Sequence, residues 1–325
     1  MTTKNLAKDI YEKPDQIPTR HGYGDALVHL GKTNKDVVVL GADLTSSLRA
    51  HLFAKEFPER FVEVGIAEQD MMNIAAGLSL VGKIPFVSTY GVFCIGRAWD
   101  QLRTTVAYAN LNVKIGSGHG GISVGPDGAT HQALEDVALS RVLPNLTVIV
   151  PTDYHETYKA TISSTKIQGP VVVRFGREKV PVITTKNTPF KVGKADIYKK
   201  GTDVTVIACG VMVYEALIAA KMLAKKGIDL EVINCHTIKP LDMDTIIASA
   251  KKTKCVVTAE EHQQIGGLGS AVAEFLSKNY PVPMRIIGVN DRFGESGPPE
   301  DLMKEFGLTH ETIIKSVQDV VKMKK

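Results

Sequence analysis

The sequence predicts an α/β protein made of two doubly wound domains, each with a largely parallel sheet. Three observations support this prediction. Short apolar runs of strand length alternate with helical patterns along the 325 residues. Runs such as VVVL and TVIV are rich in β-branched residues and are typical of strands covered on both faces. The alternation weakens once, near the middle of the chain, and then resumes, which indicates two domains.

In the first half of the chain, strands are expected to alternate with crossover helices. The predicted strands are Val37–Leu40, Phe61–Val64, Ile84–Ser88, Asn112–Ile115, Thr147–Val150 and Val171–Val173. The predicted helices are Tyr23–Gly31, Gln69–Leu80, Ala98–Asn110, Leu134–Arg141 and His155–Ser164. Parallel strands need such crossovers, so this half predicts successive βαβ units.

The second half repeats the pattern after a stretch from Arg177 to Gly201, whose prolines, lysines and threonines predict a connecting segment. The expected domains are residues 1–185 and 201–325, with a linker over 186–200. The predicted strands are Val204–Ala208, Leu230–Asn234, Cys255–Ala259 and Met284–Val289. The predicted helices are Val213–Lys225, Asp242–Ala250, Gly269–Lys278 and a terminal helix from about His310.

Composition and charge narrow the class of function. Hydrophobic residues make up 44% of the chain, enough to bury a large core. The net charge of +4, without a basic block, gives little support for nucleic-acid binding. The four cysteines form no CxxC pair, so they are interpreted as reduced packing residues with no metal site. A polar N-terminus and the lack of a long apolar run predict a soluble, cytoplasmic protein without a membrane span.

The segment Gly65–Met72, with the sequence GIAEQDMM, is the most informative motif. It follows a predicted strand and opens a helix, and Glu68 stands at the helix start, where the dipole favours a carboxylate. Apolar neighbours such as Ile66 and Met71 favour a carboxyl group that can hold or share a proton. Glu68 is therefore a candidate catalytic residue.

A glycine-rich loop over residues 116–132 is the second informative segment. Its six glycines allow the backbone to approach a ligand closely. His119, Asp127 and His131 add titrating and hydrogen-bonding groups to the same loop. The loop lacks the Gly-Lys-Ser/Thr of a Walker motif, so it does not predict a nucleoside triphosphate site.

Other candidate residues lie at strand ends. Arg177 follows a buried-type strand, at the edge where parallel sheets bind ligands, and an Arg fork matches the geometry of a phosphate. Arg20 lies just before the first predicted helix. Tyr90 and Phe93 follow another strand and could form a flat wall for a heteroaromatic ring.

Together these residues resemble the second half of a transketolase over nearly the whole chain. The most specific matches are GIAEQDMM and the loop in which His119, Asp127 and His131 occur at fixed spacing. Thr19-Arg20 and the segment Gly41–Ser47, GADLTSS, are supporting matches. The resemblance implies a pyrimidine-binding domain followed by a transketolase C-terminal domain.

The resemblance also implies thiamine diphosphate as cofactor, with its pyrimidine end on this chain. Glu68 resembles the Glu that bonds the aminopyrimidine ring, where a proton shared with a ring nitrogen favours the imino form of the amine. Tyr90 and Phe93 resemble the aromatic residues around that ring. Asp43 and Leu44 lie where the family also approaches the cofactor.

Other loop residues resemble the family's substrate-binding groups. Asp127 and His131 resemble residues that bond the hydroxyl and carbonyl oxygens of a sugar. The set that resembles the phosphate-binding residues is Arg20, Ser47, His119 and Arg177. The resemblance therefore implies transfer of a two-carbon ketol unit between ketose and aldose phosphates, as in the pentose phosphate pathway.

The sequence contains no GDG motif for the diphosphate and Mg²⁺, since Pro126-Asp127-Gly128 belongs to the glycine-rich loop. The resemblance therefore implies a split, two-chain transketolase, in which an N-terminal partner chain carries the diphosphate and Mg²⁺ site. This chain would be inactive alone. Self-association, in a heterotetramer with two copies of each chain, is expected because family members form active sites between subunits.

Three alternatives stay open. The run Glu260–Gly269 is compatible with the beta subunit of a 2-oxo acid dehydrogenase, although Asp127 and His131 suit a sugar phosphate better. The run Arg97–Gln101, RAWDQ, is closer to 1-deoxyxylulose-5-phosphate synthase, so a half enzyme of that type is a second alternative. A silent assembly subunit is the third, and the joint presence of the acid and the loop residues argues against it. The C-terminal domain is expected to contribute mainly to assembly.

Overall fold

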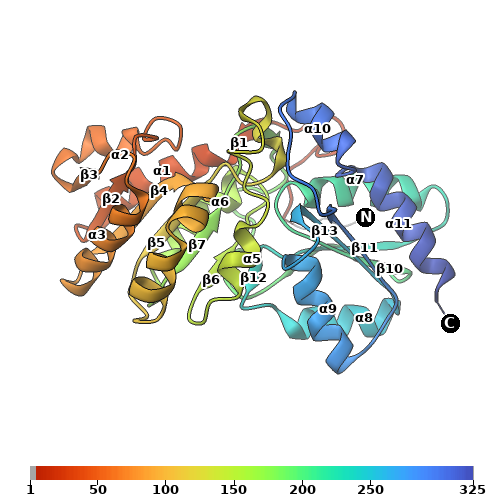
Figure 1. Cartoon of the computed structure of the whole chain (residues 1–325). Coiled ribbons are helices and arrows are strands. Elements are labelled where there is room, and N and C mark those ends of the chain that lie inside the picture. Colours follow the sequence, from red (N-terminus) through yellow and green to blue (C-terminus); the bar gives the residue numbers. More distant parts are fainter. Residues whose placement is uncertain (1–4, 325) are drawn as a thin grey trace.

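The computed structural model describes residues 5–324, in which two α/β units lie side by side (Figure 1). Within these residues the first unit has a seven-stranded sheet of order β12-β6-β7-β5-β4-β2-β3. The second has a five-stranded sheet of order β14-β13-β10-β11-β9. The predicted α/β fold with two largely parallel, doubly wound sheets is confirmed. Residues 1–4 of the predicted first domain lie outside the described residues.

The strands of the first sheet follow the predicted apolar runs. They are β2 (Val37–Gly41), β3 (Phe61–Glu63), β4 (Ile84–Tyr90), β5 (Lys114–Gly118), β6 (Thr147–Ile149) and β7 (Val171–Arg174). These six strands pair in parallel. Their carboxyl ends therefore meet at one edge of the sheet, the edge at which parallel α/β sheets bind ligands.

Helices cover both faces of this sheet, because the strands carry apolar side chains on both faces. In β2, Val37 and Val39 pack with Tyr23 and Leu27, whereas Leu40 packs on the opposite face. The first face carries α1 (Thr19–Thr33), α2 (His51–Glu56) and α6 (Tyr154–Ser164). The other carries α3 (Glu68–Leu80), η2 (Val92–Arg97), α4 (Trp99–Gln101), η3 (Leu102–Ala107) and α5 (Asp136–Arg141). Short 3₁₀ turns are η1 (Pro58–Arg60) and η4 (Ile122–Asp127).

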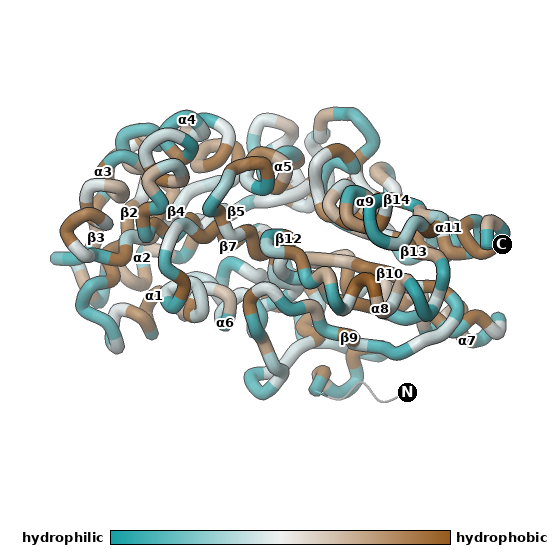
Figure 2. Tube along the Cα trace, turned by 90° about the horizontal axis from the view of Figure 1, so that it is seen from below, coloured by the Kyte–Doolittle hydropathy of each residue, from teal (hydrophilic) through white to brown (hydrophobic). Residues whose placement is uncertain are grey.

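The second unit is built in the same way. Its strands are β9 (Asp196–Lys199), β10 (Val204–Ala208), β11 (Leu230–Asn234), β13 (Val256–Gln263) and β14 (Met284–Val289). Its helices are α7 (Met212–Ala224), α8 (Met243–Thr253), α9 (Leu268–Asn279), α10 (Pro299–Glu305) and α11 (His310–Lys322). Val206 packs in one core and Ile207 in the other, and Figure 2 shows hydrophobic residues concentrated along such strands. No helix within residues 5–324 is both long enough and apolar enough to cross a bilayer.

Several contacts tie the two units together. β12 (Thr237–Lys239) leaves the second unit and pairs antiparallel with β6 of the first sheet. Near the other end of the chain, Ile10 is buried in a core that belongs to the second unit. β1 (Gln16–Pro18) and β8 (Lys179–Pro181) form a separate antiparallel pair. The two units therefore share strands and core.

The stretch predicted as an irregular connection differs from the structure. It contains both β8 and β9, and β9 is an edge strand antiparallel to β11. The sequence patterns of these strands are weak because both are short and polar, and each is stabilised by a partner strand distant in the sequence. The residue numbers at which the domains begin and end stay a prediction.

Candidate active site

The predicted site residues gather at the carboxyl edge of the first sheet. Asp43 follows β2, Glu68 opens the helix after β3, and Tyr90 ends β4. His119 follows β5, and Arg177 lies shortly after β7. Because five parallel strands end at this edge, residues from distant parts of the sequence can surround one ligand there.

Glu68 is the first residue of α3, and its side chain is only 1% exposed. Gly65 makes the turn into this helix with φ +71°. The Nη1 atom of Arg97 donates a hydrogen bond of 2.6 Å to Oε2 of Glu68, and the same guanidinium lies 4.6 Å from the ring centroid of Phe93. Of the apolar neighbours expected from the sequence, Met71 is fully buried whereas Ile66 is 72% exposed, and a cation contacts the carboxylate directly. Arg97, which the sequence left without a role, is thus part of the site.

Four predicted residues form an aromatic cluster, which Arg97 connects to this acid. Tyr90 and Phe93 are stacked with ring centroids 5.8 Å apart. His119, with φ +55°, stacks on Tyr90 at 3.6 Å. His131 meets the Tyr90 and Phe93 rings edge-on at 5.9 and 5.6 Å. The loop histidines and the strand-end aromatics therefore form one wall, as a flat ring-binding surface requires.

His119 is buried in a cationic environment. Burial, followed by the charges of Arg20 and Arg177, lowers the pKa of His119 to about 3. The imidazole is therefore neutral at neutral pH. Its Nδ1 atom is buried and has no hydrogen-bond partner among residues 5–324. Such an orphaned atom suits a polar ligand group rather than an ion pair.

Arginines concentrate positive charge next to this wall. Arg20 donates from Nη1 to the carbonyl oxygen of Ser47 at 3.0 Å, and Arg177 donates from Nη1 to Oδ1 of Asp127 at 2.9 Å. Burial and the charge of Arg177 lower the pKa of Arg20, and Arg49 acts in the same direction. Sequence reasoning missed Arg49, because nothing in its local sequence distinguishes it from a surface arginine. Glu178, 3.3 Å from Nε of Arg177, acts on the pKa of Arg20 in the opposite direction. Arginines grouped in this way can bind an anion through charge-assisted hydrogen bonds.

Asp43 and Leu44 are less connected to the other predicted residues. The amide of Asp43 donates to Oε1 of Glu63 at 2.8 Å, and its side chain is exposed. Leu44 packs on the core under α1. In the described part of the chain, neither residue makes a hydrogen bond or ion pair to another predicted site residue.

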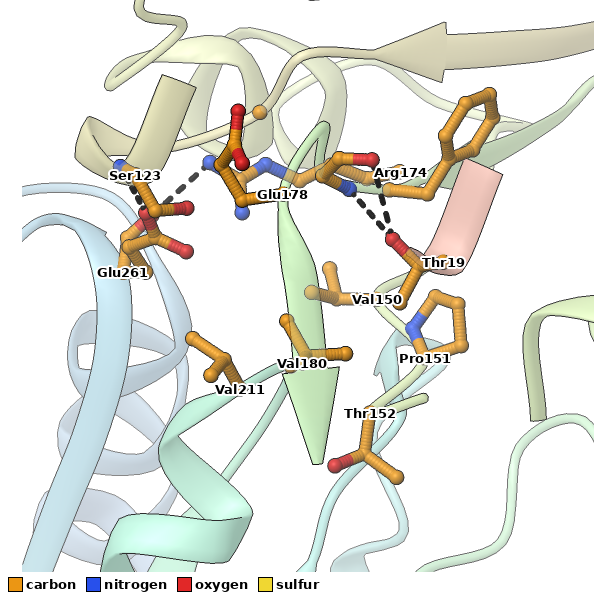
Figure 3. Close-up of a pocket in the computed structure, with 14 residues that line it drawn as sticks. Thr19, Ser123, Val150, Pro151, Thr152, Arg174, Glu178, Val180, Val211 and Glu261 are labelled. Carbon is orange, nitrogen blue, oxygen red and sulfur yellow. Dashed lines mark hydrogen bonds between the residues drawn. The ribbon is translucent and has the colours of Figure 1, made fainter. Parts of the chain in front are cut away.

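Two cavities are lined by other residues, and the smaller one includes Thr19, Gly120 and Gly176, which are chain neighbours of Arg20, His119 and Arg177. The small one drawn in Figure 3, of about 30 Å³, is lined by Thr19, Ser123, Arg174 and Glu261 among others. A wider cleft of about 1190 Å³ is bordered by β8, α10 and the start of α11. None of the predicted site residues lines either of these two cavities.

Comparisons with known proteins agree with this architecture. Residues 15–182 match the family described as transketolase, pyrimidine binding domain, and residues 193–313 match transketolase, C-terminal domain. The chain is 46% identical to a putative transketolase C-terminal section of Methanocaldococcus jannaschii, covering 93% of this chain and 96% of that protein. It is 42% identical to the 6-deoxy-6-sulfo-D-fructose transketolase subunit of Clostridium sp. (strain MSTE9), covering 94% and 95%. A solved split gene transketolase, described as an inactive beta4 tetramer, has a TM-score of 0.89 and 48% identity, covering 95% of this chain and 100% of that one.

Proposed function

Because this chain belongs to the transketolase family, we propose that it is one subunit of a two-chain, thiamine-diphosphate-dependent enzyme. The reaction is transfer of a two-carbon ketol unit between a ketose phosphate and an aldose phosphate. One observation carries the proposal: the buried acid Glu68 and the arginines Arg20, Arg49 and Arg177 lie at the same sheet edge, joined by the aromatic wall. This arrangement provides an acid for the ring of the cofactor and an anion-binding end for the sugar phosphate.

The residues fit the pyrimidine end of thiamine diphosphate. A buried carboxylate at a helix start is linked through Arg97 to the ring of Phe93, and the stacked rings of Phe93 and Tyr90 can pack on a heteroaromatic ring. When bound, this cofactor supplies a nucleophilic carbon and an electron sink for the ketol carbons. Glu68 would share a proton with a nitrogen of the ring. For this, Arg97 has to release the carboxylate or move along it.

The loop and the arginines would hold the sugar. Neutral His119 offers an uncharged hydrogen-bonding atom. The Asp127 carboxylate can accept from sugar hydroxyl groups, and a ring N–H of His131 can donate to a hydroxyl or carbonyl oxygen. The arginines bind the terminal anion, since guanidinium groups form charge-assisted hydrogen bonds with phosphate oxygens. Stacked rings beside these groups exclude water from the reacting atoms.

The partner chain in this proposal carries the diphosphate and Mg²⁺ site, and the assembly is a heterotetramer. The similarity to a C-terminal section and to a split gene transketolase supports a partner. The inactive beta4 assembly of the latter protein supports self-association and inactivity without the partner. The pentose phosphate pathway is the proposed setting.

The decisive experiment is reconstitution. The purified chain is assayed alone and with its N-terminal partner, thiamine diphosphate and Mg²⁺, using xylulose 5-phosphate as ketol donor. Activity only in the mixture is expected, and full activity of the chain alone would refute the two-chain proposal. Turnover of pyruvate with a lipoyl acceptor would instead favour a 2-oxo acid dehydrogenase.

A second substrate candidate follows from the anion site. Arginines bind a sulfonate as well as a phosphate, and one similar protein is a 6-deoxy-6-sulfo-D-fructose transketolase subunit. Comparing kcat/KM for that donor and for xylulose 5-phosphate in the same reconstituted enzyme decides between them.

A further inference from the structure

The glycine-rich loop, residues 116–132, is held from outside by the second unit of the chain. We propose that Glu261, at the end of β13, is a positioning residue that fixes this loop in its substrate-binding conformation. The inference rests on the proposed function and assigns to the second unit a role in the site, beyond the assembly role expected from the sequence.

Glu261 contacts the loop through its side chain. The side chain is 7% exposed, and Oε1 accepts a hydrogen bond of 2.6 Å from the backbone N–H of Ser123 (Figure 3). The backbone oxygen of Glu261 accepts from Nη2 of Arg174 at 2.9 Å, and the same nitrogen donates to the oxygen of Ala133, just past the loop. Glu261 is thereby joined directly to the middle of the loop at Ser123 and, through Arg174, to Ala133 just past its end. Hydrogen bonds to a buried carboxylate are among the stronger ones in proteins.

The glycines of the loop are packed against the second unit. A Cβ atom on Gly121, which has φ +98°, would lie 2.3 Å from the carboxyl carbon of Glu261. A Cβ atom on Gly128 would lie 2.4 Å from Oγ of Ser296. From the sequence, these glycines were expected to allow close approach of the backbone to a ligand. At these two positions the close neighbour is the second unit.

Gln132 adds a second attachment from within the loop. Its side chain is buried, and Nε2 donates to the backbone oxygens of Ile122, Gly125 and Glu295 at 3.1, 3.3 and 2.8 Å. The segment around Glu295 belongs to the connection between β14 and α10. The second unit therefore holds the loop at two places, one of which is a single carboxylate that can be removed.

The held part of the loop lies next to the predicted substrate groups. Ser123 precedes Val124, whose oxygen accepts a hydrogen bond of 3.1 Å from Nη1 of Arg177, and that nitrogen also bonds Asp127. Loosening the Ser123 amide therefore displaces the Asp127–Arg177 pair. Glu68 lies on α3 and has no contact with Glu261 among the described residues. Loss of Glu261 should consequently weaken substrate binding rather than the chemistry at the cofactor.

The test compares Glu261→Ala, Glu261→Gln and a matched control, Glu260→Gln. Glu260 is the preceding residue and equally buried, but its carboxylate accepts from the amides of Leu268 and Gly269 within the second unit. Hydrogen exchange of the backbone amides of residues 121–128, apart from Pro126, is measured in the isolated chain. This measurement does not require enzymatic activity. Glu261→Ala is expected to accelerate it roughly 10- to 100-fold, as for loss of a hydrogen bond to a charged group. Glu261→Gln, whose amide oxygen still accepts, and Glu260→Gln are expected to remain near the wild-type rate.

The reconstituted enzyme supplies the second readout. Glu261→Ala is expected to raise KM for the sugar phosphate roughly tenfold with kcat nearly unchanged, and Glu261→Gln to restore most of the affinity. Unchanged loop exchange in Glu261→Ala, equal acceleration in Glu260→Gln, or an unchanged KM despite a loosened loop would overturn the inference. Lack of ketol transfer by the wild-type assembly would overturn the proposed function instead, and the exchange data would still decide whether Glu261 holds the loop.

Discussion

Replacing Arg97 with glutamine is expected to tighten binding of thiamine diphosphate. The guanidinium of Arg97 occupies both partners that the pyrimidine ring would use, because it bonds the carboxylate of Glu68 at 2.6 Å and covers the ring of Phe93 at 4.6 Å. If the ring takes the same carboxylate oxygen, Oε2, and the same aromatic face, Arg97 has to leave both. The free energy of these two contacts then opposes cofactor binding.

The size of the effect follows from the exposure of the pair. A hydrogen bond to a charged group contributes about 1.5–3 kcal/mol when buried and an exposed ion pair about 0.2–1 kcal/mol. Since Arg97 is 46% exposed, about 1 kcal/mol is appropriate for its bond to Glu68. The contact with the Phe93 ring adds about 0.5 kcal/mol. Removing both should lower the dissociation constant roughly tenfold.

Calorimetric titration of the reconstituted enzyme with thiamine diphosphate, at saturating Mg²⁺, measures this change. Arg103→Gln is the control, since Arg103 is an exposed arginine in the adjoining helical turn, and it should bind the cofactor like the wild type. Weaker or unchanged binding by Arg97→Gln would refute the reasoning. It would mean that Arg97 supports the acid in the bound state instead of competing with the ring.

Three further changes have defined outcomes. Glu68→Ala should abolish turnover of the reconstituted enzyme while both chains still co-elute on gel filtration; retained turnover would reject its role. Asp127→Asn removes the charge-assisted bond to Arg177 and should raise KM for the sugar phosphate roughly tenfold in steady-state assays. Burial lowers the pKa of Lys114 to about 7, below its unfolded value, so the unfolded state binds more protons above pH 7 and stability rises with pH there. The free energy of unfolding in urea of the wild type, relative to that of Lys114→Met, should rise by at most about 2 kcal/mol between pH 7 and pH 9.

The sequence predicts the fold well where a segment is buried on both faces. The run VVVL forms β2 because both sets of alternate side chains enter a core, a requirement visible in the residues themselves. The edge strands β1, β8, β9 and β12 were missed. Each has only three or four residues, and each forms through hydrogen bonds to a strand distant in the sequence. Edge pairing of this kind leaves no periodic pattern to detect.

The sequence predicts the site less completely. Glu68 is recognisable from the sequence because apolar residues flank this acid, and His119 because it lies in a glycine-rich loop. Arg49 and Arg97 cannot be recognised in this way, because their neighbours in the site come from other elements of the fold. For Arg97 those neighbours are the start of α3 and the ring of Phe93.

The cofactor end and the sugar end of this site should be separable. Arg97 acts on Glu68, which α3 positions, whereas Glu261 acts on the loop through Ser123, and the two share no direct partner in the described chain. Free-energy changes at sites without shared partners add. The double variant Arg97→Gln/Glu261→Ala should therefore combine tighter cofactor binding with weaker substrate binding, each as large as in the single variant. Steady-state KM and cofactor titrations of all four proteins measure this. If the effect on KM or on the cofactor dissociation constant in the double variant differs more than about threefold from that in the corresponding single variant, the two ends communicate. His131, whose ring meets that of Phe93 at 5.6 Å, is then the residue that connects them.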